Sequence, residues 1–142
     1  MSDEIRASLP IRLSRVRDFA EEVEAFGEAA GLPDTKIYIV NLTLDELIAN
    51  VVMYGFDGVA DPEIDVELTL ADNKLVLTLE DNGRPFDPTQ DVAPDITSPL
   101  MDRPVGGLGR YFVKRLADRF SYELVNGRNR VTVEYDVTPD GK

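Results

Sequence analysis

Residues 64–79 alternate between apolar and polar side chains, and this pattern constrains the fold more than any other feature of the chain. The apolar positions are Ile64, Val66, Leu68, Leu70, Leu75, Leu77 and Leu79. A period of two is that of a β-strand with one buried face. Asp72 and Asn73 interrupt the alternation with residues that favour a tight turn, so the segment predicts an antiparallel hairpin.

Apolar residues at helical spacing predict three helices. The first covers residues 16–30, and the second covers residues 35–52 with Asp34 or Thr35 as its N-cap. The third begins at Leu108, directly after a run of glycines. Its predicted apolar face consists of Leu108, Phe112, Val113, Leu116, Ala117 and Phe120.

Further strands are predicted near both ends of the chain. A short edge strand is expected at residues 9–13, and two strands joined by a turn at Asn126 and Gly127 are expected between residues 122 and 135. Antiparallel strands with helices packed on one face form a two-layer α/β sandwich of the α+β class. A length of 142 residues is typical of one domain, so we expect a single domain over residues 1–142.

The composition excludes several kinds of chemistry. The chain has no cysteine and no histidine. It therefore lacks a thiolate nucleophile, a zinc–sulfur site, an imidazole base and a phosphorylatable histidine. Any bound metal must be held by oxygen ligands, which favours Mg²⁺ or a similar hard cation.

The charge and hydropathy of the chain narrow its partners. A net charge of −12 argues against nucleic acid, because Lys and Arg normally supply most of that affinity. It does not argue against a nucleotide, which a metal ion and a few backbone N–H groups can hold. The sequence shows no signal peptide and no membrane-spanning run, so a cytoplasmic protein without membrane contact is expected.

Asp81 is a carboxylate at an unexpected position. It shares the apolar face of the strand at residues 75–79, so it is expected to point towards the helices. A carboxylate in an apolar layer is costly unless it meets a hydrogen-bonding partner or a polar ligand. The alternative is that Asp81-Asn82-Gly83 is a simple hairpin turn. Residues 84–88 do not continue as a strand, which favours a ligand-facing Asp81.

Glu46 and Asn50 lie one helical turn apart, on the same side of the second helix. Both interrupt an otherwise apolar run, although Asn is a poor helix former and Glu is rarely buried without a partner. One interpretation is a polar pair at the boundary of the core. The other is functional, because an amide oxygen beside a carboxylate suits an oxygen-liganded metal and a hydroxyl nucleophile.

The glycine run opens the third helix. Its residues are Gly106, Gly107, Leu108 and Gly109. Glycines at this position uncover the first backbone N–H groups, where the helix dipole is positive, so a phosphate could bind there. The alternative is a flexible loop before an ordinary helix. Neither a Walker motif nor a dinucleotide fingerprint is present.

The segment between Asp81 and the glycine run is interpreted as a lid. The 22 residues from 84 to 105 include five prolines and show no periodic pattern. A loop of this length inside a domain is usually functional. We expect a lid at about residues 84–106 that hangs between the carboxylate and the glycines.

Three motifs occur in the order of a known superfamily. They are Glu46-Leu-Ile-Ala-Asn50, Asp81-Asn82-Gly83 and Gly107-Leu108-Gly109, with the lid before the last of them. Over nearly its whole length the chain resembles the GHKL (Bergerat-fold) ATP-binding superfamily. It is most similar to the small single-domain branch of anti-sigma-factor serine/threonine kinases. The sequence segments at residues 81–88 and 103–109 resemble the corresponding segments of that branch.

The resemblance implies an ATP–Mg²⁺ complex under the lid. At the base end, it implies that Asp81 accepts the exocyclic amine of adenine and that Gly83 lets the base lie close to the backbone. It also suggests that Thr132 completes the adenine contact.

At the phosphate end, the resemblance implies that Asn50 binds Mg²⁺ and that Glu46 orients or deprotonates the attacking hydroxyl of a serine or threonine. The glycine run would hold the phosphates. The chain departs from the family at Met53 and Tyr54, where members often carry a basic residue or histidine. At Arg110 a commonly apolar residue is replaced, and Arg110 could either contact phosphate or face solvent.

The implied function is that of a kinase in a partner-switching circuit. Its partner would be a STAS-type anti-sigma-factor antagonist, and the kinase would otherwise hold a sigma factor. A homodimer is compatible with this function. The alternative is a non-catalytic, ATP-dependent protein-binding switch. A stand-alone ATPase is disfavoured because nothing resembles a coupled mechanical domain.

Overall fold

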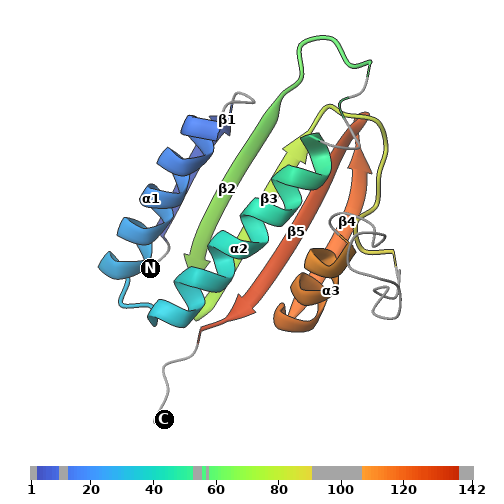
Figure 1. Cartoon of the computed structure of the whole chain (residues 1–142). Coiled ribbons are helices and arrows are strands. Elements are labelled where there is room, and N and C mark those ends of the chain that lie inside the picture. Colours follow the sequence, from blue (N-terminus) through green and yellow to red (C-terminus); the bar gives the residue numbers. More distant parts are fainter. Residues whose placement is uncertain (1–2, 10–12, 53–55, 57, 91–106, 138–142) are drawn as a thin grey trace, which may run out of the picture.

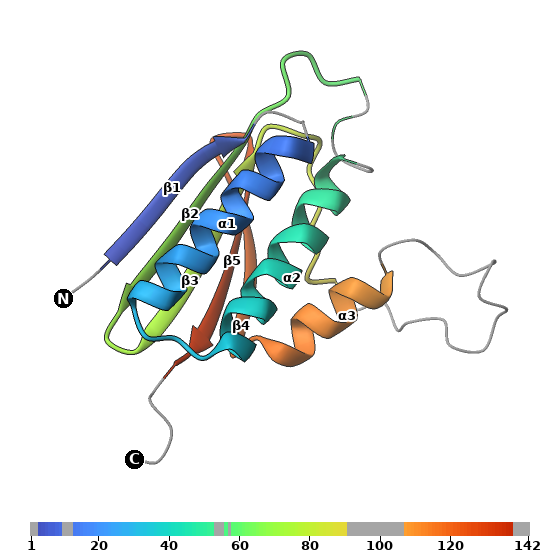
Figure 2. The same cartoon turned by 60° about the vertical axis from the view of Figure 1, so that its left-hand side comes forward.

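The computed structural model describes residues 3–9, 13–52, 56, 58–90 and 107–137. The strands are β1 (Asp3–Leu9), β2 (Ile64–Ala71), β3 (Lys74–Asp81), β4 (Arg119–Val125) and β5 (Arg128–Asp136), and the helices are α1 (Leu13–Ala29), α2 (Asp34–Asn50) and α3 (Gly107–Leu116). The strands form one antiparallel sheet in the order β1-β2-β3-β5-β4, and the helices lie on one of its faces (Figures 1 and 2). The expected α+β two-layer sandwich is confirmed.

Two tight turns set the register of the sheet. Asp72 and Asn73 have φ values of 53° and 61°, and Asn126 and Gly127 have φ values of 52° and 79°. Two successive left-handed residues are the signature of the type I′ hairpin turn, so both predicted turns form. The separate pairing of β3 with β5, which neither turn joins, places Asp81, the last residue of β3, directly opposite Asn129 of β5.

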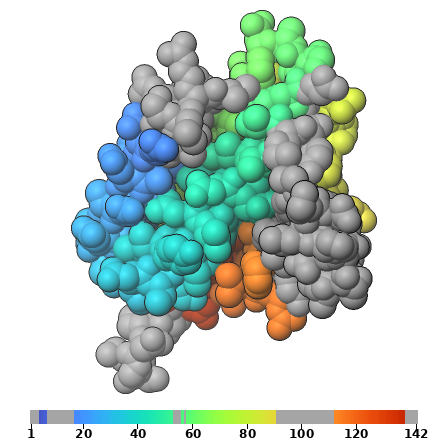
Figure 3. All heavy atoms as spheres, in the orientation of Figure 1, coloured from blue at the N-terminus to red at the C-terminus, as the bar shows by residue number. Residues whose placement is uncertain are grey.

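The core lies between the sheet and the helices. In the space-filling view α2 crosses the middle of the helical face, with α1 on one side and α3 on the other (Figure 3). Alternate residues of the three central strands face α2 and are buried. The most enclosed are Ile64, Leu68, Leu75, Leu77, Leu79, Val133 and Tyr135, which pack with Phe19, Val23, Val40, Leu44 and Leu47 from the helices.

The opposite face of the sheet is polar. Arg128 forms ion pairs with Glu63 and Asp65 at 3.0 and 2.8 Å, and Arg130 pairs with Glu80 at 3.0 Å. Ion pairs at such exposed positions contribute little to stability. Among the described residues, no helix is long and apolar enough to cross a membrane.

The edge strand lies earlier in the chain than the predicted residues 9–13. It is β1 (Asp3–Leu9), which pairs with β2 from Asp3↔Leu70 to Leu9↔Ile64. Leu13 instead begins α1. Residues 10–12 lie outside the described residues, and the prediction did not weigh that Pro10 has no N–H group to donate to a neighbouring strand.

The helix termini also differ from the predictions. Pro33, with φ −62° and ψ 147°, is the N-cap of α2, and no side chain caps this end. Asp34 is already the first helical residue, where its charge favours the positive end of the helix dipole. The cap assignment to Asp34 or Thr35 is therefore wrong by one residue or more.

The face that α3 buries is narrower than predicted. Val113 is buried, but Phe112 and Leu116 are 46% and 43% exposed. The helix ends at Leu116, and Phe120 belongs to β4. Among the described elements, α3 lies at the side of the helical layer and packs against α2 and β4, which leaves Phe112 and Leu116 partly exposed.

Gly27 allows the close approach of α1 and α2. A Cβ atom at this position would lie 2.5 Å from Cγ1 of Ile37. We expect Gly27→Val to lower the free energy of unfolding by about 2 kcal/mol, because overpacking displaces a buried side chain. Urea unfolding measures the effect. The control is Ala29→Val, at an exposed position of the same helix, and an equal loss in both variants would contradict the close approach.

Tyr135 makes stability sensitive to alkaline pH. Burial raises its pKa from 10.0 to about 12, and its hydroxyl is hydrogen-bonded to Thr43. Because the folded state keeps the proton longer than the unfolded chain, this contribution is complete below pH 10 and is lost as the pH rises to about 12. The loss is about 1.4 kcal/mol per pH unit. Thermal melts of Tyr135→Phe should show a shallower alkaline decline than the wild type; parallel declines would exclude Tyr135 as the source.

Candidate nucleotide-binding site

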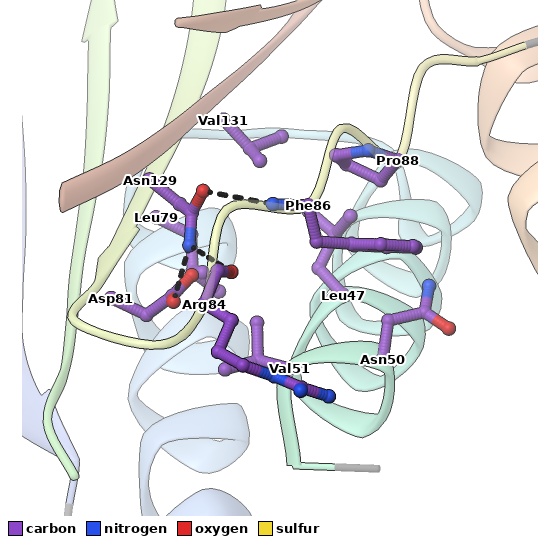
Figure 4. Close-up of a pocket in the computed structure, with 10 residues that line it drawn as sticks. All are labelled: Leu47, Asn50, Val51, Leu79, Asp81, Arg84, Phe86, Pro88, Asn129 and Val131. Atoms are coloured by element: carbon purple, nitrogen blue, oxygen red, sulfur yellow. Dashed lines mark hydrogen bonds between the residues drawn. The ribbon is translucent and has the colours of Figure 1, made fainter. Parts of the chain in front are cut away.

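A pocket opens beside α2, at the end of the sheet where β3 finishes (Figure 4). Its walls come from α2, β3, β5 and the loop that follows β3. The lining residues are Leu47, Asn50, Val51, Leu79, Asp81, Arg84, Phe86, Pro88, Asn129 and Val131. Figure 4 shows the polar groups on two sides, with Asp81 and Asn129 deep on one side and Asn50 and the Arg84 guanidinium on the other.

Asp81 lies at the closed side of the pocket, where the alternation of β3 predicts it. It is 2% exposed. Its Oδ1 accepts hydrogen bonds from the backbone N–H of Gly83 at 2.8 Å and from Nδ2 of Asn129 at 2.9 Å. Within the part of the chain that the structure describes, Oδ2 accepts none. The carboxylate is thus oriented through one oxygen, and the other can receive a ligand.

Burial raises the pKa of Asp81 above its usual value of 3.8, although the hydrogen bonds from Asn129 and Gly83 and the charge of Arg128 act in the opposite direction. A buried carboxylate with a raised pKa is common in functional sites, where a ligand supplies the missing hydrogen bond. The path of the chain after Asp81 agrees with a ligand-facing carboxylate. Asn82 and Gly83 leave the strand and do not form the turn of a hairpin.

Glu46 and Asn50 form a hydrogen-bonded pair on α2. Nδ2 of Asn50 donates to Oε2 of Glu46 at 3.0 Å. Asn50 is 2% exposed and lines the pocket, whereas Glu46 is half-buried. Because Nδ2 of Asn50 is hydrogen-bonded to Glu46, the other atom of the amide, Oδ1, is the one that can bind a ligand. An amide oxygen of this kind is a suitable ligand for Mg²⁺.

Among the described residues, no group of three Asp or Glu side chains is close enough to hold a metal ion alone. A divalent ion beside Asn50 would therefore need further oxygen ligands from a bound phosphate chain or from water. This donor set fits a metal that arrives with a nucleotide, because Mg²⁺ commonly binds through one or two protein ligands plus substrate phosphates.

Asn129 is the site residue that sequence reasoning missed. It is 3% exposed and lies beside Asp81. A signal was available, because Asn129 shares the buried face of β5 with Val131, Val133 and Tyr135. The same alternation that pointed to Asp81 marks this amide as a polar group in an apolar row.

Thr132 does not reach the pocket. It lies on the opposite face of β5 from Asn129 and Val131, and it pairs with Thr78 and Ser121 in the neighbouring strands. The prediction that Thr132 contacts the base is not supported by this geometry. The assignment came from the resemblance alone, and the alternation of β5 places neighbouring residues such as Val131 and Thr132 on opposite faces of the sheet.

The first residues of the predicted lid line one side of the pocket and form hydrogen bonds with β5 and α3. The N–H of Phe86 donates to Oδ1 of Asn129 at 3.2 Å. Asp87 accepts hydrogen bonds from the N–H and hydroxyl of Thr89 at 2.8 and 2.6 Å, and Nζ of Lys114 on α3 donates to the carbonyl of Thr89 at 3.3 Å. Residues 84–90 of the predicted lid are thus hydrogen-bonded to β5 and α3, and the lid at about residues 84–106 stays a prediction.

The remaining predicted phosphate residues lie near the start of α3. Gly107, Leu108 and Gly109 form its first turn, so the glycines stand at a helix N-terminus as predicted. The first N–H groups of a helix have no partner within the helix itself. Met53, Tyr54 and lid residues 91–106, which include Gly106, lie outside the described residues, so their roles stay predictions.

The chemistry of the pocket suits a flat, partly polar ring. Six of the ten lining residues are apolar, and they come from both the helix and the loop wall. The free oxygen of Asp81 can accept an N–H group at the edge of such a ring. A compound with a ring at this side and anionic groups near Asn50 would match both polar ends.

Comparison with known proteins agrees with this assignment. A family model described as "Histidine kinase-like ATPase domain" matches residues 7–135. The serine-protein kinase RsbW of Listeria monocytogenes serovar 1/2a is 28% identical over 139 residues, which cover 95% of this chain and 88% of that protein. The serine/threonine-protein kinase BtrW of Bordetella bronchiseptica is 27% identical over 103 residues, or 72% of each chain.

The family model covers all but the two ends of the chain, including every described residue of the pocket. The sandwich topology and the two polar sides of the pocket agree with that match. On both grounds, this chain belongs to the family of histidine kinase-like ATPase domains.

Proposed function

We propose that this protein binds ATP with Mg²⁺ and transfers the γ-phosphoryl group to a serine or threonine of a partner protein. The observation that carries the proposal is the arrangement of polar groups at the pocket. Asp81 lies on one side, and the hydrogen-bonded pair of Glu46 and Asn50 lies on α2 at the other side. Asp81, Asn50 and Glu46 match, in that order, an adenine amine, a phosphate-bound metal and a protein hydroxyl.

At the base end, Oδ2 of Asp81 accepts a hydrogen bond from the exocyclic amine of adenine. The apolar side chains of Leu47, Val51 and Phe86 cover the ring. A guanine base presents a carbonyl at the same position, so two acceptors would face each other and GTP would be rejected. Gly83 is buried beside Asp81 and has no side chain to obstruct the base.

At the phosphate end, Oδ1 of Asn50 binds the metal, and the first turn of α3 binds phosphate oxygens through its N–H groups. Mg²⁺ would neutralise charge that develops on the transferred phosphoryl group. On a chain with a net charge of −12, such neutralisation would also favour the binding of a triphosphate.

The half-buried Glu46 carboxylate is the candidate general base. The hydroxyl oxygen of the partner attacks the γ-phosphorus, the bond from that phosphorus to the β,γ-bridging oxygen breaks, and ADP leaves. The hydroxyl proton passes to Glu46. Asn50 holds Oε2 of this carboxylate, which limits its rotation.

The partner is proposed from the relatives. Proteins named serine-protein kinase RsbW and serine/threonine-protein kinase BtrW align with most of this chain. Together with the resemblance to anti-sigma-factor kinases, this supports a STAS-type anti-sigma-factor antagonist as the phosphorylated partner and a sigma factor as the alternative partner.

Incubating the protein with γ-³²P-ATP, Mg²⁺ and a purified STAS protein from the same genome tests the proposal. We expect label on a serine or threonine of the STAS protein, and none when EDTA is added. Tight ATP binding without transfer to any STAS protein of that genome would favour the non-catalytic switch. Absence of ATP binding would refute both.

A further inference from the structure

Asn129 makes more hydrogen bonds than a structural amide on a strand needs. Its Nδ2 donates to Oδ1 of Asp81 at 2.9 Å, to the carbonyl of Arg84 at 3.0 Å and to the carbonyl of Gly83 at 3.3 Å. Its Oδ1 accepts from the N–H of Phe86 at 3.2 Å. One side chain therefore joins the carboxylate of the pocket to Gly83, Arg84 and Phe86 of the loop wall. Figure 4 draws its hydrogen bonds to Asp81, Arg84 and Phe86.

The hydroxyl of Tyr122 on β4 donates to the same Oδ1 at 2.5 Å. The neighbours determine which way the amide points. Every group around Nδ2 is an acceptor, and the Phe86 N–H beside Oδ1 can only donate. A flipped amide would place an N–H group against the N–H of Phe86 and its oxygen against three acceptors, so a single orientation is stable.

We infer that Asn129 is a positioning residue for base recognition, which aims Oδ2 of Asp81 at the ring edge and holds the wall at residues 83–86 against the ring. The inference rests on the proposed function, because it assumes that a purine lies in this pocket. Asn129 acts through Asp81 and the loop and does not itself contact the reacting atoms. Tyr122 fixes Asn129 from the neighbouring strand.

An amide is the side chain that can do this. Fixing Asp81 requires a donor, and fixing Phe86 requires an acceptor, and both must lie within one short side chain. A hydroxyl offers a single donor, so it could not serve Asp81 and the loop carbonyls together. In a buried network of this kind the members reinforce one another, and removing the central member affects all of them.

The coupling between Asn129 and the amine of the base is measurable. We would titrate the wild type and Asn129→Ala with ATP and with purine riboside triphosphate, which lacks the exocyclic amine, by isothermal titration calorimetry. In the wild type ATP should bind about 10- to 100-fold more tightly, because it makes one more hydrogen bond to a charged acceptor. In Asn129→Ala this preference should fall to about threefold or less.

Two further variants separate positioning from simple loss of structure. Tyr122→Phe keeps Asn129 but removes the hydroxyl that donates to its Oδ1, so that only the N–H of Phe86 still donates to this atom. This variant should reduce the preference for ATP by about threefold. Thr132→Val lies on the same strand but faces the other way, and it should leave the preference unchanged. If Asn129→Ala fails to fold, as shown by circular dichroism, Tyr122→Phe provides the test alone.

A preference for ATP that is unchanged in Asn129→Ala and Tyr122→Phe would overturn the inference, even if both nucleotides bind more weakly. Equal weakening is the result expected of a purely structural residue. Failure of the proposed function gives a different outcome, because the wild type itself would then bind neither nucleotide or show no preference for ATP.

Discussion

Asp81→Asn is expected to weaken ATP binding by about 100-fold or more, because a charged acceptor for the adenine amine is replaced by a donor. The new side chain has nearly the same shape. Its Oδ1 can keep the hydrogen bonds from Gly83 and Asn129. Its Nδ2 then stands where Oδ2 was and faces an amine that is also a donor. Isothermal titration calorimetry with ATP measures the loss.

The fold should tolerate this change. Burial raises the pKa of Asp81, so the folded state disfavours the charged form. Above the raised pKa the ionised group costs stability, and that cost disappears as the pH falls through the raised pKa towards 3.8. Asp81→Asn removes the charge, so its melting temperature at neutral pH should equal or exceed that of the wild type.

The control is Asp72→Asn at the other end of the β2–β3 hairpin. Asp72 is exposed and has a φ of 53°, a conformation that Asn tolerates well. This variant should bind ATP like the wild type. Wild-type affinity in Asp81→Asn would refute the adenine role, and an equal loss in the two variants would point to a general effect of charge.

Glu46→Gln is expected to slow phosphoryl transfer to the partner by about 10²- to 10⁴-fold, because a side chain that cannot take up a proton replaces the general base. A glutamine oxygen can still accept the hydrogen bond from Nδ2 of Asn50, so the metal ligand stays in position. ATP affinity should therefore change by less than about threefold. Single-turnover transfer of ³²P and calorimetry measure the two effects separately.

Asp45 offers a matched control, since it is the preceding carboxylate on α2 and is exposed. Asp45→Asn should retain transfer. Undiminished transfer in Glu46→Gln would exclude Glu46 as the base. If ATP binding were lost to the same extent as transfer, Glu46 would instead act by orienting Asn50.

Much of the site followed from local pattern. The alternation of β3 predicted that Asp81 faces the helices, and the one-turn spacing on α2 predicted that Glu46 and Asn50 lie together. Both predictions depend only on the geometry of a single element, which its residues largely determine. Thr132 was suggested by the resemblance and not by such a pattern, and Asn129, which lies beside Asp81 because β5 pairs with β3, was missed.

The first part of the lid shows the same limit. Its prolines and lack of periodicity marked residues 84–106 as a long loop. Nothing in the sequence of residues 84–90 indicates that Phe86 is held by β5 or that Thr89 is held by α3. These contacts join residues that are 43 and 25 positions apart. The local sequence of a loop does not show whether the loop packs against distant elements, because that depends on its tertiary partners.

The sequence by itself determined the sandwich, its two I′ hairpins and the three polar groups Glu46, Asn50 and Asp81, because periodicity and turn chemistry act within a few residues. Only the tertiary structure decided that Asn129 stands beside Asp81, with Tyr122 behind it. That arrangement depends on the register between β3, β4 and β5. Register is a property of paired strands, so it is settled when the turns and the core bring them together.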